Sequence, residues 1–309
     1  MNTLAEGIAV ERPPHDPGQA NTKPASIIAE WPVGSFVENL LPMANGTALV
    51  AVHSANEVYA VELSTGTKRV FSKLPAPCAG MVETFGAVFV NVGEIGQPGA
   101  AVYRLDAQGQ AERWVEVPEG LFLNGSAVLS PALILVVDSI AGKVFLVNLD
   151  ARTVQTWIDH EWLRKISQEP MLPGVNGVKV FGGYAYFSNT DRSLICKAKI
   201  KADGSAGGLE IVAERLVADD FAFDVTGAMY LTTHVYNSLL RLNPDGTRKE
   251  LGTAEGGFAG STSAAFGRDA AHRYDVFVTT TGGILAPWEG KVATGKLLKV
   301  AVGVSGAPI

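Results

Sequence analysis

One unit of alternating apolar strands and polar turns recurs along most of the 309-residue chain, and this repeat is the strongest constraint on its fold. A complete copy lies at residues 219–242, where an acidic pair precedes an apolar strand, a turn follows at 224–227, and two more strands lead to a turn at 243–246. Alternation with a period of two residues, interrupted by Gly, Asp, Asn and Pro, predicts short antiparallel strands joined by tight turns. The chain is therefore expected to be all-β.

Six anchor positions mark the start of this unit, each a small or polar residue next to an apolar strand. They are Glu38, Ala79, Asn124, Asn176, Asp219 and Thr262. The intervals between them are 41, 45, 52, 43 and 43 residues, and such a period with several strands per unit is typical of propeller blades. The sequence thus predicts a six-bladed β-propeller with four-stranded antiparallel blades, in which the third strand of the last blade lies at 296–300.

A closed ring leaves no free sheet edge if a strand from one end of the chain completes the blade at the other end. Residues 25–31 are apolar enough to supply a strand to the last blade, so we predict closure by an N-terminal strand; the alternative is that it belongs only to the first blade. Residues 1–24 are polar and rich in Pro, which predicts a flexible segment along the surface. The single propeller domain then spans 25–309.

Composition argues against several classes of function. The net charge is −6 and no basic run is present that would follow a phosphate backbone, so nucleic acid is not an expected partner. No window approaches the ~18 apolar residues of a membrane span, and we expect no signal peptide. Cys78 and Cys196 fit neither a disulfide framework nor a metal motif. We expect a cytoplasmic protein, monomeric or homodimeric, that acts on a small-molecule substrate and binds no membrane.

In a propeller the first strand of each blade lines the central channel, so equivalent positions of the repeat converge on one axis. Four of the six anchors carry oxygen donors: Glu38, Asn124, Asn176 and Asp219. Two carboxylates and two carboxamides suit a divalent cation such as Ca²⁺, Mg²⁺, Zn²⁺ or Mn²⁺ and predict a metal site. We expect Asp219 rather than Asp220 to face the channel, because adjacent strand residues point to opposite sides. The alternative is that each anchor is simply a turn residue before a strand.

A second set of polar residues follows these anchors by 13 to 15 residues, at the end of the second strand. Its members are His53, Asp138, Asn189 and His234. Tight hairpins bring this position close to the same mouth of the channel, so Asp138 is a candidate general base and His234 a candidate acid or base. His53 and Asn189 are candidate substrate contacts. The alternative is that each residue satisfies backbone groups at the end of its blade.

Two insertions lengthen the repeat and carry tryptophans. Residues 159–174 have the pattern of one or two helical turns around Trp162, and residues 284–295 add Trp288 to the last unit. Insertions of this kind usually lie on the functional face of a propeller, although they can be surface decoration. We predict that Trp162, Tyr236 and Trp288 wall an apolar substrate pocket, with blade packing as the alternative for Tyr236.

Several short motifs in the repeat together indicate a resemblance to known proteins. They are VENL at 37–40, LNG at 123–125, VNG at 175–177, DDFAFD at 219–224 and GSTSAAFGR at 260–268. With these motifs the chain resembles, over about residues 25–300, the superfamily of senescence marker protein (regucalcin), gluconolactonase and luciferin-regenerating enzyme. Members of this superfamily are six-bladed propellers.

The resemblance implies a metal-dependent site. In the lactonases of the superfamily a Glu, two Asn and an Asp bind a divalent cation in the channel, and the Asp is also proposed as the general base. These roles fall on Glu38, Asn124, Asn176 and Asp219. The lactonases have EGP at the first of these sites and Pro-Asp-Gly at the last, whereas this chain has ENL and Asp-Asp-Phe.

The first functional hypothesis is therefore a lactonase-like hydrolase of a lactone or cyclic ester, with a divalent cation in the channel and Asp219 or a nearby carboxylate activating water. The motifs also resemble propeller proteins of secondary-metabolite pathways, among them hetero-Diels-Alderases that need no metal. A metal-free small-molecule cyclase, which would act by positioning its substrate, is thus the alternative. A noncatalytic ligand-binding propeller is a third hypothesis.

Overall fold

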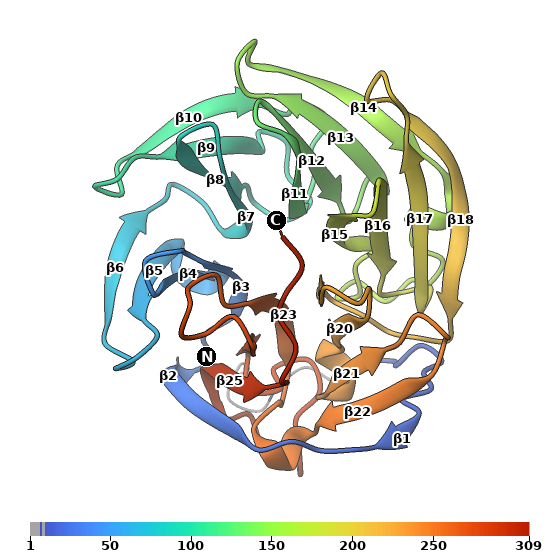
Figure 1. Cartoon of the computed structure of the whole chain (residues 1–309). Helices are drawn as coiled ribbons and strands as arrows, with labels where there is room; N and C mark the ends of the chain where they lie inside the picture. The colour runs from blue at the N-terminus through green and yellow to red at the C-terminus, as the bar shows by residue number, and fades with distance from the viewer. Residues whose placement is uncertain (1–6, 8–9, 309) are drawn as a thin grey trace.

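The computed structural model describes residue 7 and residues 10–308 of the chain. These residues form six β-sheets arranged as blades around a central axis (Figure 1). Neighbouring strands within a blade are antiparallel, as the repeat predicts. The six-bladed β-propeller expected from the sequence is confirmed.

Blades 1 to 3 each consist of four consecutive strands. Blade 1 contains β3 (Val37–Pro42), β4 (Thr47–Val52), β5 (Glu57–Glu62) and β6 (Lys68–Lys73). Blade 2 contains β7 (Cys78–Thr84), β8 (Ala87–Val92), β9 (Ala101–Leu105) and β10 (Ala111–Glu116). Blade 3 contains β11 (Leu123–Ser130), β12 (Leu133–Asp138), β13 (Lys143–Asn148) and β14 (Thr153–Asp159).

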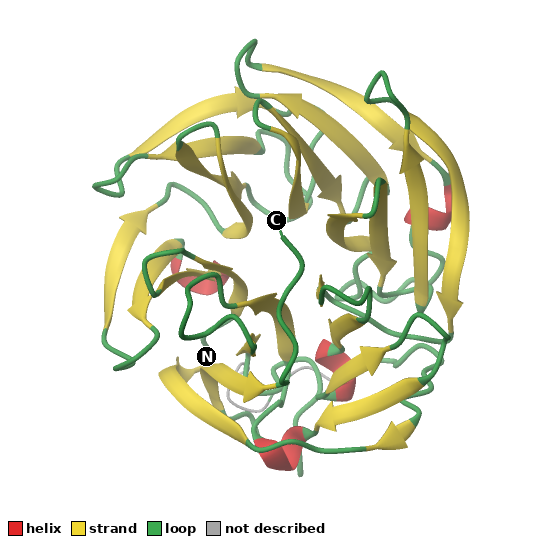
Figure 2. Cartoon of the chain, viewed as in Figure 1, coloured by secondary structure: helices red, strands yellow, loops and turns green. Residues whose placement is uncertain are grey.

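Blades 5 and 6 also take up strands from the N-terminal part of the chain. Blade 4 contains β15 (Val175–Phe181), β16 (Tyr184–Asn189), β17 (Leu194–Ile200) and β18 (Ala206–Glu214). Blade 5 contains β19 (Phe221–Phe223), β20 (Met229–Thr232), β21 (Leu239–Leu242) and β22 (Arg248–Gly252), with β1 (Gln19–Ala20) parallel to β22. Blade 6 contains β23 (Ser261–Phe266), β24 (Asp275–Thr280), β25 (Thr294–Ala301) and β2 (Ala25–Val33). Short 3₁₀ helices lie at His53–Ala55, Glu161–Leu163, His234–Tyr236 and Ala254–Gly256 (Figure 2).

Burial decreases from the axis towards the rim of each blade. The first strands β3, β7, β11, β15, β19 and β23 lie next to one another around the axis (Figure 1). In blade 1, β3 and β4 are almost wholly buried, whereas β6 exposes most of its residues. Inner strands are apolar on both faces because each blade packs between two others, and clusters such as that around Phe89, Val136 and Phe145 fill the space between blades 2 and 3.

The ring is closed by β2, which pairs antiparallel with β25 as the outermost strand of blade 6. The pairing runs from Ala25 opposite Val300 to Val33 opposite Thr294. Trp31 anchors the strand, since it is 3% exposed and packs in a cluster with Val50 and Leu63 of blade 1. The predicted closure by an N-terminal strand is confirmed, and so is the displaced third strand of the last blade.

Glycines that follow the anchors permit close packing of neighbouring first strands. A Cβ on Gly80 would lie 2.2 Å from the carbonyl oxygen of Asn124, and one on Gly125 would lie 2.6 Å from that of Asn176. A Cβ on Gly177 would lie 2.8 Å from Oδ1 of Asp220. Gly125 and Gly177 lie within strands, so they serve a close approach of backbones rather than the turns considered for Asn-Gly pairs.

In several blades, a buried side chain near the end of the second strand donates a hydrogen bond to the next blade of the ring. Asn91 donates its Nδ2 hydrogen bond to the carbonyl of Asn124 at 2.6 Å. Ser188 donates to the carbonyl of Asp219 at 2.9 Å, and Thr232 donates to that of Thr262 at 2.7 Å. These bonds recur at one register of the repeat and tie blades 2, 4 and 5 to the anchors of blades 3, 5 and 6.

Segments from both ends of the described chain cross opposite faces of the ring. Residues 10–16 pack against the face that carries the loops after the second strands, where His15 accepts a hydrogen bond from the Val217 amide at 3.0 Å. The expected flexible segment begins with residues 1–6, 8 and 9, which lie outside the described residues. Residues 302–308 cross the centre of the other face (Figure 1), where Ala307 donates to the Phe223 carbonyl at 2.9 Å.

Two further expectations concern cysteines and membranes. Cys78 and Cys196 are free and buried, and burial raises the pKa of both thiols to about 12. No helix among the described residues combines the length and the apolar character needed to cross a membrane.

Candidate functional site

The four polar anchors all lie at the buried inner edge of the ring. Glu38 belongs to β3, Asn124 to β11 and Asn176 to β15, and Asp219 lies two residues before β19. Their exposed fractions range from 3 to 7%. Polar groups buried to this degree need partners, and the partners define what the site can do.

The two asparagines are oriented by the same arrangement in successive blades. Asn124 donates its Nδ2 hydrogen bond to Ser139 at 3.2 Å, and the Ser139 hydroxyl donates in turn to the Val175 carbonyl at 2.7 Å. In the next blade Asn176 donates to Thr190 at 3.0 Å, and the Thr190 hydroxyl donates to a backbone carbonyl. Because each amide nitrogen is held by the blade, each Oδ1 remains as an acceptor without a hydrogen bond from any described residue.

Asp219 is the residue that joins the anchors of blades 4 and 5. Its Oδ1 accepts a short hydrogen bond from Nδ2 of Asn176. Its Oδ2 lies 3.0 Å from Nδ1 of His234, an ion-pair distance. That contact lacks the geometry of a hydrogen bond, so the buried Oδ2 has no hydrogen-bond partner within residues 10–308. An unsatisfied buried carboxylate oxygen is costly unless another group, such as a cation, takes up its lone pairs.

Glu38 adds a further carboxyl group to the same region. Burial raises its pKa well above the usual value, and the negative charges of Asp219 and Asp220 raise it further. Lys179 forms an ion pair with Asp220, but neither Glu38 nor Asp219 pairs with a Lys or Arg of the described chain. The inner channel therefore holds three carboxyl groups, of which Asp220 alone pairs with a Lys or Arg of the described chain.

Both members of the Asp219–Asp220 pair lie on the channel side, and the expectation that only Asp219 would do so is wrong. The amide of Asp219 donates to the Thr232 carbonyl at 2.7 Å, and the Thr232 amide donates to the Asp220 carbonyl at 3.0 Å. Two consecutive residues thus face one residue of β20, which is the geometry of a β-bulge. Similar register shifts follow the anchors in β3, β7, β11, β15 and β23. A bulge interrupts the alternation on which the expectation rested.

The rings of His234 and His53 both lie close to the ring of one aromatic residue, Phe36. The ring of Phe36 lies 5.4 Å from that of His234 and 5.7 Å from that of His53. His234 is 5% exposed. Its φ of 43° lies in the left-handed region that non-glycine residues rarely occupy. His53 contacts the Cys78 carbonyl through Nδ1 at 3.1 Å, and burial lowers its pKa. His234 alone of the two contacts an anchor carboxylate.

Asp138 and Asn189 form hydrogen bonds with backbone groups of nearby loops, and their catalytic and substrate-binding roles stay predictions. The carboxylate of Asp138 accepts hydrogen bonds from four backbone amides, those of Leu121, Phe122, Ile140 and Ala141. Asn189 donates to the carbonyls of Trp162 and Arg164 and accepts from the Arg192 amide. Both residues are fully buried, and their hydrogen bonds hold the loops at the ends of their blades. Such hydrogen bonds are those expected under the structural alternative considered from the sequence.

The three aromatic residues predicted to wall a pocket do not line the cavity described below. Trp162 packs against the core of blades 3 and 4, and Trp288 is 42% exposed. Tyr236 stacks on His15 and donates to the Pro13 carbonyl at 2.7 Å, so residues 10–16 cover it. The two insertions contribute Leu172, Ile284, Leu285, Ala286 and Val292 to an apolar cluster with Phe36 on this face. The insertions therefore pack over this mouth of the channel.

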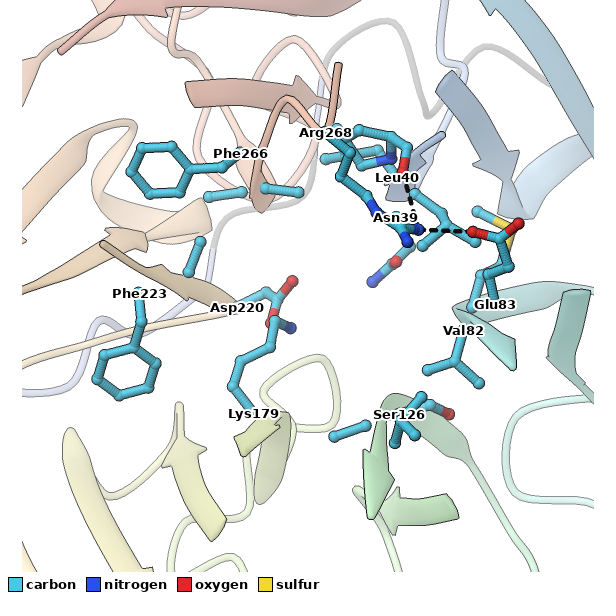
Figure 3. Close-up of a pocket in the computed structure, with 18 of the residues that line it drawn as sticks. Asn39, Leu40, Val82, Glu83, Ser126, Lys179, Asp220, Phe223, Phe266 and Arg268 are labelled. Carbon is cyan, nitrogen blue, oxygen red and sulfur yellow. Dashed lines mark hydrogen bonds and ion pairs between the residues drawn. The ribbon is translucent and has the colours of Figure 1, made fainter. Parts of the chain in front are cut away.

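A cavity of about 220 Å³ lies on the other side of the anchors, where the first strands run into their hairpins (Figure 3). Its wall is mainly apolar and includes Leu40, Val82, Val180, Phe223 and Phe266. Its charged groups form two pairs on opposite sides, Lys179 with Asp220 and Arg268 with Glu83 (Figure 3). Asn39 and Asp220 line the cavity and directly follow the anchors Glu38 and Asp219, so the cavity begins where the anchor ring ends.

Sequence reasoning missed the polar residues of this cavity, although one of them left a signal. Lys179 lies within the apolar strand VNGVKVF, between Val178 and Val180. A lysine in a first strand marks a side chain that needs a buried partner, and Asp220 provides it. Asn39, Glu83 and Arg268 have no such signal, because their positions depend on bulges and on the hairpins of three different blades.

No family model matches the sequence, and no curated protein matches it significantly. Solved structures do match. A gluconolactonase from Xanthomonas campestris aligns with 97% of this chain and 97% of its own, at 16% identity and a TM-score of 0.66. Luciferin-regenerating enzyme aligns with 99% of this chain and 96% of its own, at 12% identity and a TM-score of 0.65. A calcium-binding protein, regucalcin from Agrobacterium tumefaciens, aligns with 97% and 95%, at 16% identity and a TM-score of 0.61.

The chain has the gluconolactonase-like propeller fold. The resemblance seen in the sequence motifs is thus confirmed as a likeness of fold. Identities of 12 to 16% carry no information about substrate, and functions are grafted onto a fold by individual sites.

The residues of this gluconolactonase-like fold suit a divalent cation. Among residues 10–308, no three His, Cys, Asp or Glu side chains form a metal site by themselves. A site would therefore need the amide oxygens of Asn124 and Asn176 beside the carboxylates of Glu38 and Asp219. Two free amide oxygens, one unsatisfied carboxylate oxygen of Asp219 and the carboxyl group of Glu38 form a set of oxygen donors, which hard cations prefer.

Proposed function

We propose that the chain is a lactonase-like hydrolase that opens a lactone or cyclic ester at the anchor ring of the channel. The observation that carries the proposal is the buried Oδ2 of Asp219, which lacks a hydrogen-bond partner in the described part of the chain while two further carboxyl groups lie near it. The likeness of fold to gluconolactonase supports the choice of reaction.

Four residues would hold a divalent cation: Glu38, Asn124, Asn176 and Asp219. A bound cation would supply Lewis acidity, polarising the carbonyl of the ester and lowering the pKa of water. Ser139 and Thr190 orient the two amides so that their oxygens stay available. The arrangement needs no movement of the blades, because the hydroxyls are themselves fixed by backbone carbonyls.

Asp219 and His234 would handle the proton of the attacking water. Oδ2 of Asp219 takes up a proton as the water oxygen attacks the ester carbonyl, and returns it to the ring oxygen as the C–O bond breaks, while Nδ1 of His234, 3.0 Å away, stabilises the carboxylate. The apolar cluster around Phe36 limits the access of bulk water to this pair from one side.

Asp219→Asn tests the assignment, because it retains the shape of the side chain and removes its ability to accept a proton. We expect kcat/KM for lactone hydrolysis to fall by about 10²- to 10⁴-fold, which is the usual contribution of a general base. Asp203→Asn is the matched control, since Asp203 lies in an exposed turn, and it should leave hydrolysis unchanged. Chelation should abolish hydrolysis and added divalent ions should restore it. Full lactonase activity in Asp219→Asn, or after chelation, would contradict the proposal.

A further inference from the structure

The cavity next to the anchor ring is partly covered towards solvent by a segment of the chain itself. Residues 302–308 cross this mouth, and Ala307 and Pro308 form part of the wall. The Val225 amide donates to the Ser305 carbonyl at 3.0 Å, and the Ala307 amide donates to the Phe223 carbonyl at 2.9 Å. Gly306 packs so tightly that a Cβ there would lie 2.4 Å from Cβ of Phe266. These contacts narrow the opening at the end of the channel and make the cavity a partly covered compartment.

The polar groups of the compartment have unused donors and few unused acceptors. Asp220 accepts from Lys179 with Oδ1 and from Ser263 with Oδ2, the latter at 2.6 Å. Lys179 uses one of its three N–H bonds in this contact and has no second hydrogen-bond partner among the described residues, although its ammonium lies 5.6 Å from the centre of the Phe221 ring. The side chain of Asn39 makes no hydrogen bond with residues 10–308, although it is only 8% exposed. A ligand that offers an acceptor oxygen would satisfy these groups.

The rest of the wall restricts the ligand further. Leu40, Val82, Val128, Val180 and Phe223 present apolar surface. Hydroxyl groups of a polyhydroxylated ligand would lose their hydrogen bonds to water against this surface and gain few in return. The volume is also below the roughly 300 to 1,000 Å³ of pockets for drug-sized molecules, so the ligand is small.

We infer that the substrate is an apolar lactone, one with alkyl or aryl substituents rather than sugar hydroxyls, whose substituent occupies this cavity. The inference rests on the proposed function, since it places the ester group at the anchor ring. Asn39 and Lys179 direct their free donors at the acceptor oxygen of the substrate, and the apolar wall holds the substituent. Entry is from the face crossed by residues 302–308, because the apolar cluster around Phe36 covers the opposite mouth.

Binding of lactams, which resist hydrolysis, separates this inference from the proposed reaction. We expect the affinity of the full-length protein, measured by isothermal titration, to rise by about three- to fourfold for each methylene added to an alkyl lactam until the cavity is filled. A lactam derived from a sugar should bind more weakly than any of them. Asn39→Leu should weaken binding of the alkyl lactams by about tenfold, because it removes a hydrogen bond to the carbonyl.

Val180→Trp should abolish binding of the longer lactams by filling the cavity, while Val70→Trp on the outer strand of blade 1, where Val70 is 38% exposed, should not. Circular dichroism checks that each variant folds. Equal affinity for alkyl and sugar lactams, or unchanged affinity in both Val180→Trp and Asn39→Leu, would overturn the inference. Tight alkyl-lactam binding without hydrolysis of any lactone would overturn the proposed reaction and leave only the preference of the cavity for apolar ligands. Hydrolysis of sugar lactones without alkyl-lactam binding would overturn only the inference about substrate class.

Discussion

At the scale of single residues, the inner edge of the channel depends on which residue type stands at each position of the repeat. Asn124 and Asn176 each occupy one position of the repeat, and the glycine after each of them allows the next blade to approach. The Asn-Gly pair therefore combines an oriented oxygen donor with a close backbone contact. Neither function requires a turn, which is the usual interpretation of Asn-Gly in a sequence.

Gly125→Ala tests the close contact. The added Cβ would lie 2.6 Å from the carbonyl oxygen of Asn176, and a backbone atom within a strand has little freedom to move away. We expect a loss of about 1 to 3 kcal/mol in the free energy of unfolding, measured by guanidinium denaturation. Gly208→Ala is the control, since nothing lies within 4 Å of a Cβ at that site, and its effect should stay within about 0.5 kcal/mol. Equal stability of the two variants would contradict the contact.

His15 makes the docking of residues 10–16 dependent on pH. Burial and, to a smaller extent, the Arg248 guanidinium lower its pKa to about 4, against the opposing effect of Asp16. Because the folded protein favours the neutral ring, its contribution to docking is complete above the unfolded pKa of 6.5 and is lost as the pH falls towards 4. Protonation of Nδ1 would also remove the acceptor of the Val217 amide.

We expect protection of the Val217 amide against hydrogen exchange, corrected for the intrinsic rate, to decrease as the pH falls from 7 to 5. His15→Phe retains an aromatic ring over Tyr236 but has no titratable group, so its protection should not depend on pH over this range. The same decrease in both proteins would show that another group is responsible.

At the scale of elements, the strands and their order followed from the sequence, whereas the local irregularities did not. Alternating apolar residues and turns locate the blades because each strand packs between two neighbours. The bulge that brings both Asp219 and Asp220 to the channel depends on the pairing with Thr232, which belongs to another strand. The hydrogen-bond partners of Asp138 and Asn189 are backbone groups in loops. Their positions in the repeat therefore did not reveal these contacts.

Trp31→Ala tests the strand that closes the ring. The indole is 3% exposed and packs among residues of blades 1 and 6, so its removal leaves a large cavity. We expect a loss of about 3 to 5 kcal/mol in the free energy of unfolding. Ile27 lies on the same strand but is 54% exposed, so Ile27→Ala should cost far less. Comparable losses from both substitutions would mean that β2 does not act as a packed closing strand.

At the scale of the whole molecule, the propeller gathers residues that are far apart in the sequence into one channel with two different ends. One end is covered by residues 10–16, the insertions and Phe36, and the other end holds the cavity beneath residues 302–308. The repeat predicted the anchors that lie between these ends. It could not predict the covering segments, because they lie outside the repeated unit and pack through contacts particular to this chain.

The most direct test of a cation at the anchors is the thermal unfolding midpoint of the chelated protein, measured by calorimetry as Ca²⁺, Mg²⁺, Mn²⁺ or Zn²⁺ is added. At about 100 times its Kd, an ion that binds only the folded protein stabilises it by about 2.7 kcal/mol. We predict a rise of the midpoint with at least one ion, lost in a Glu38→Gln, Asp219→Asn double variant and kept in an Asp203→Asn, Asp245→Asn control. No rise with any ion, or an equal rise in the Glu38→Gln, Asp219→Asn variant, would contradict a metal site in the channel.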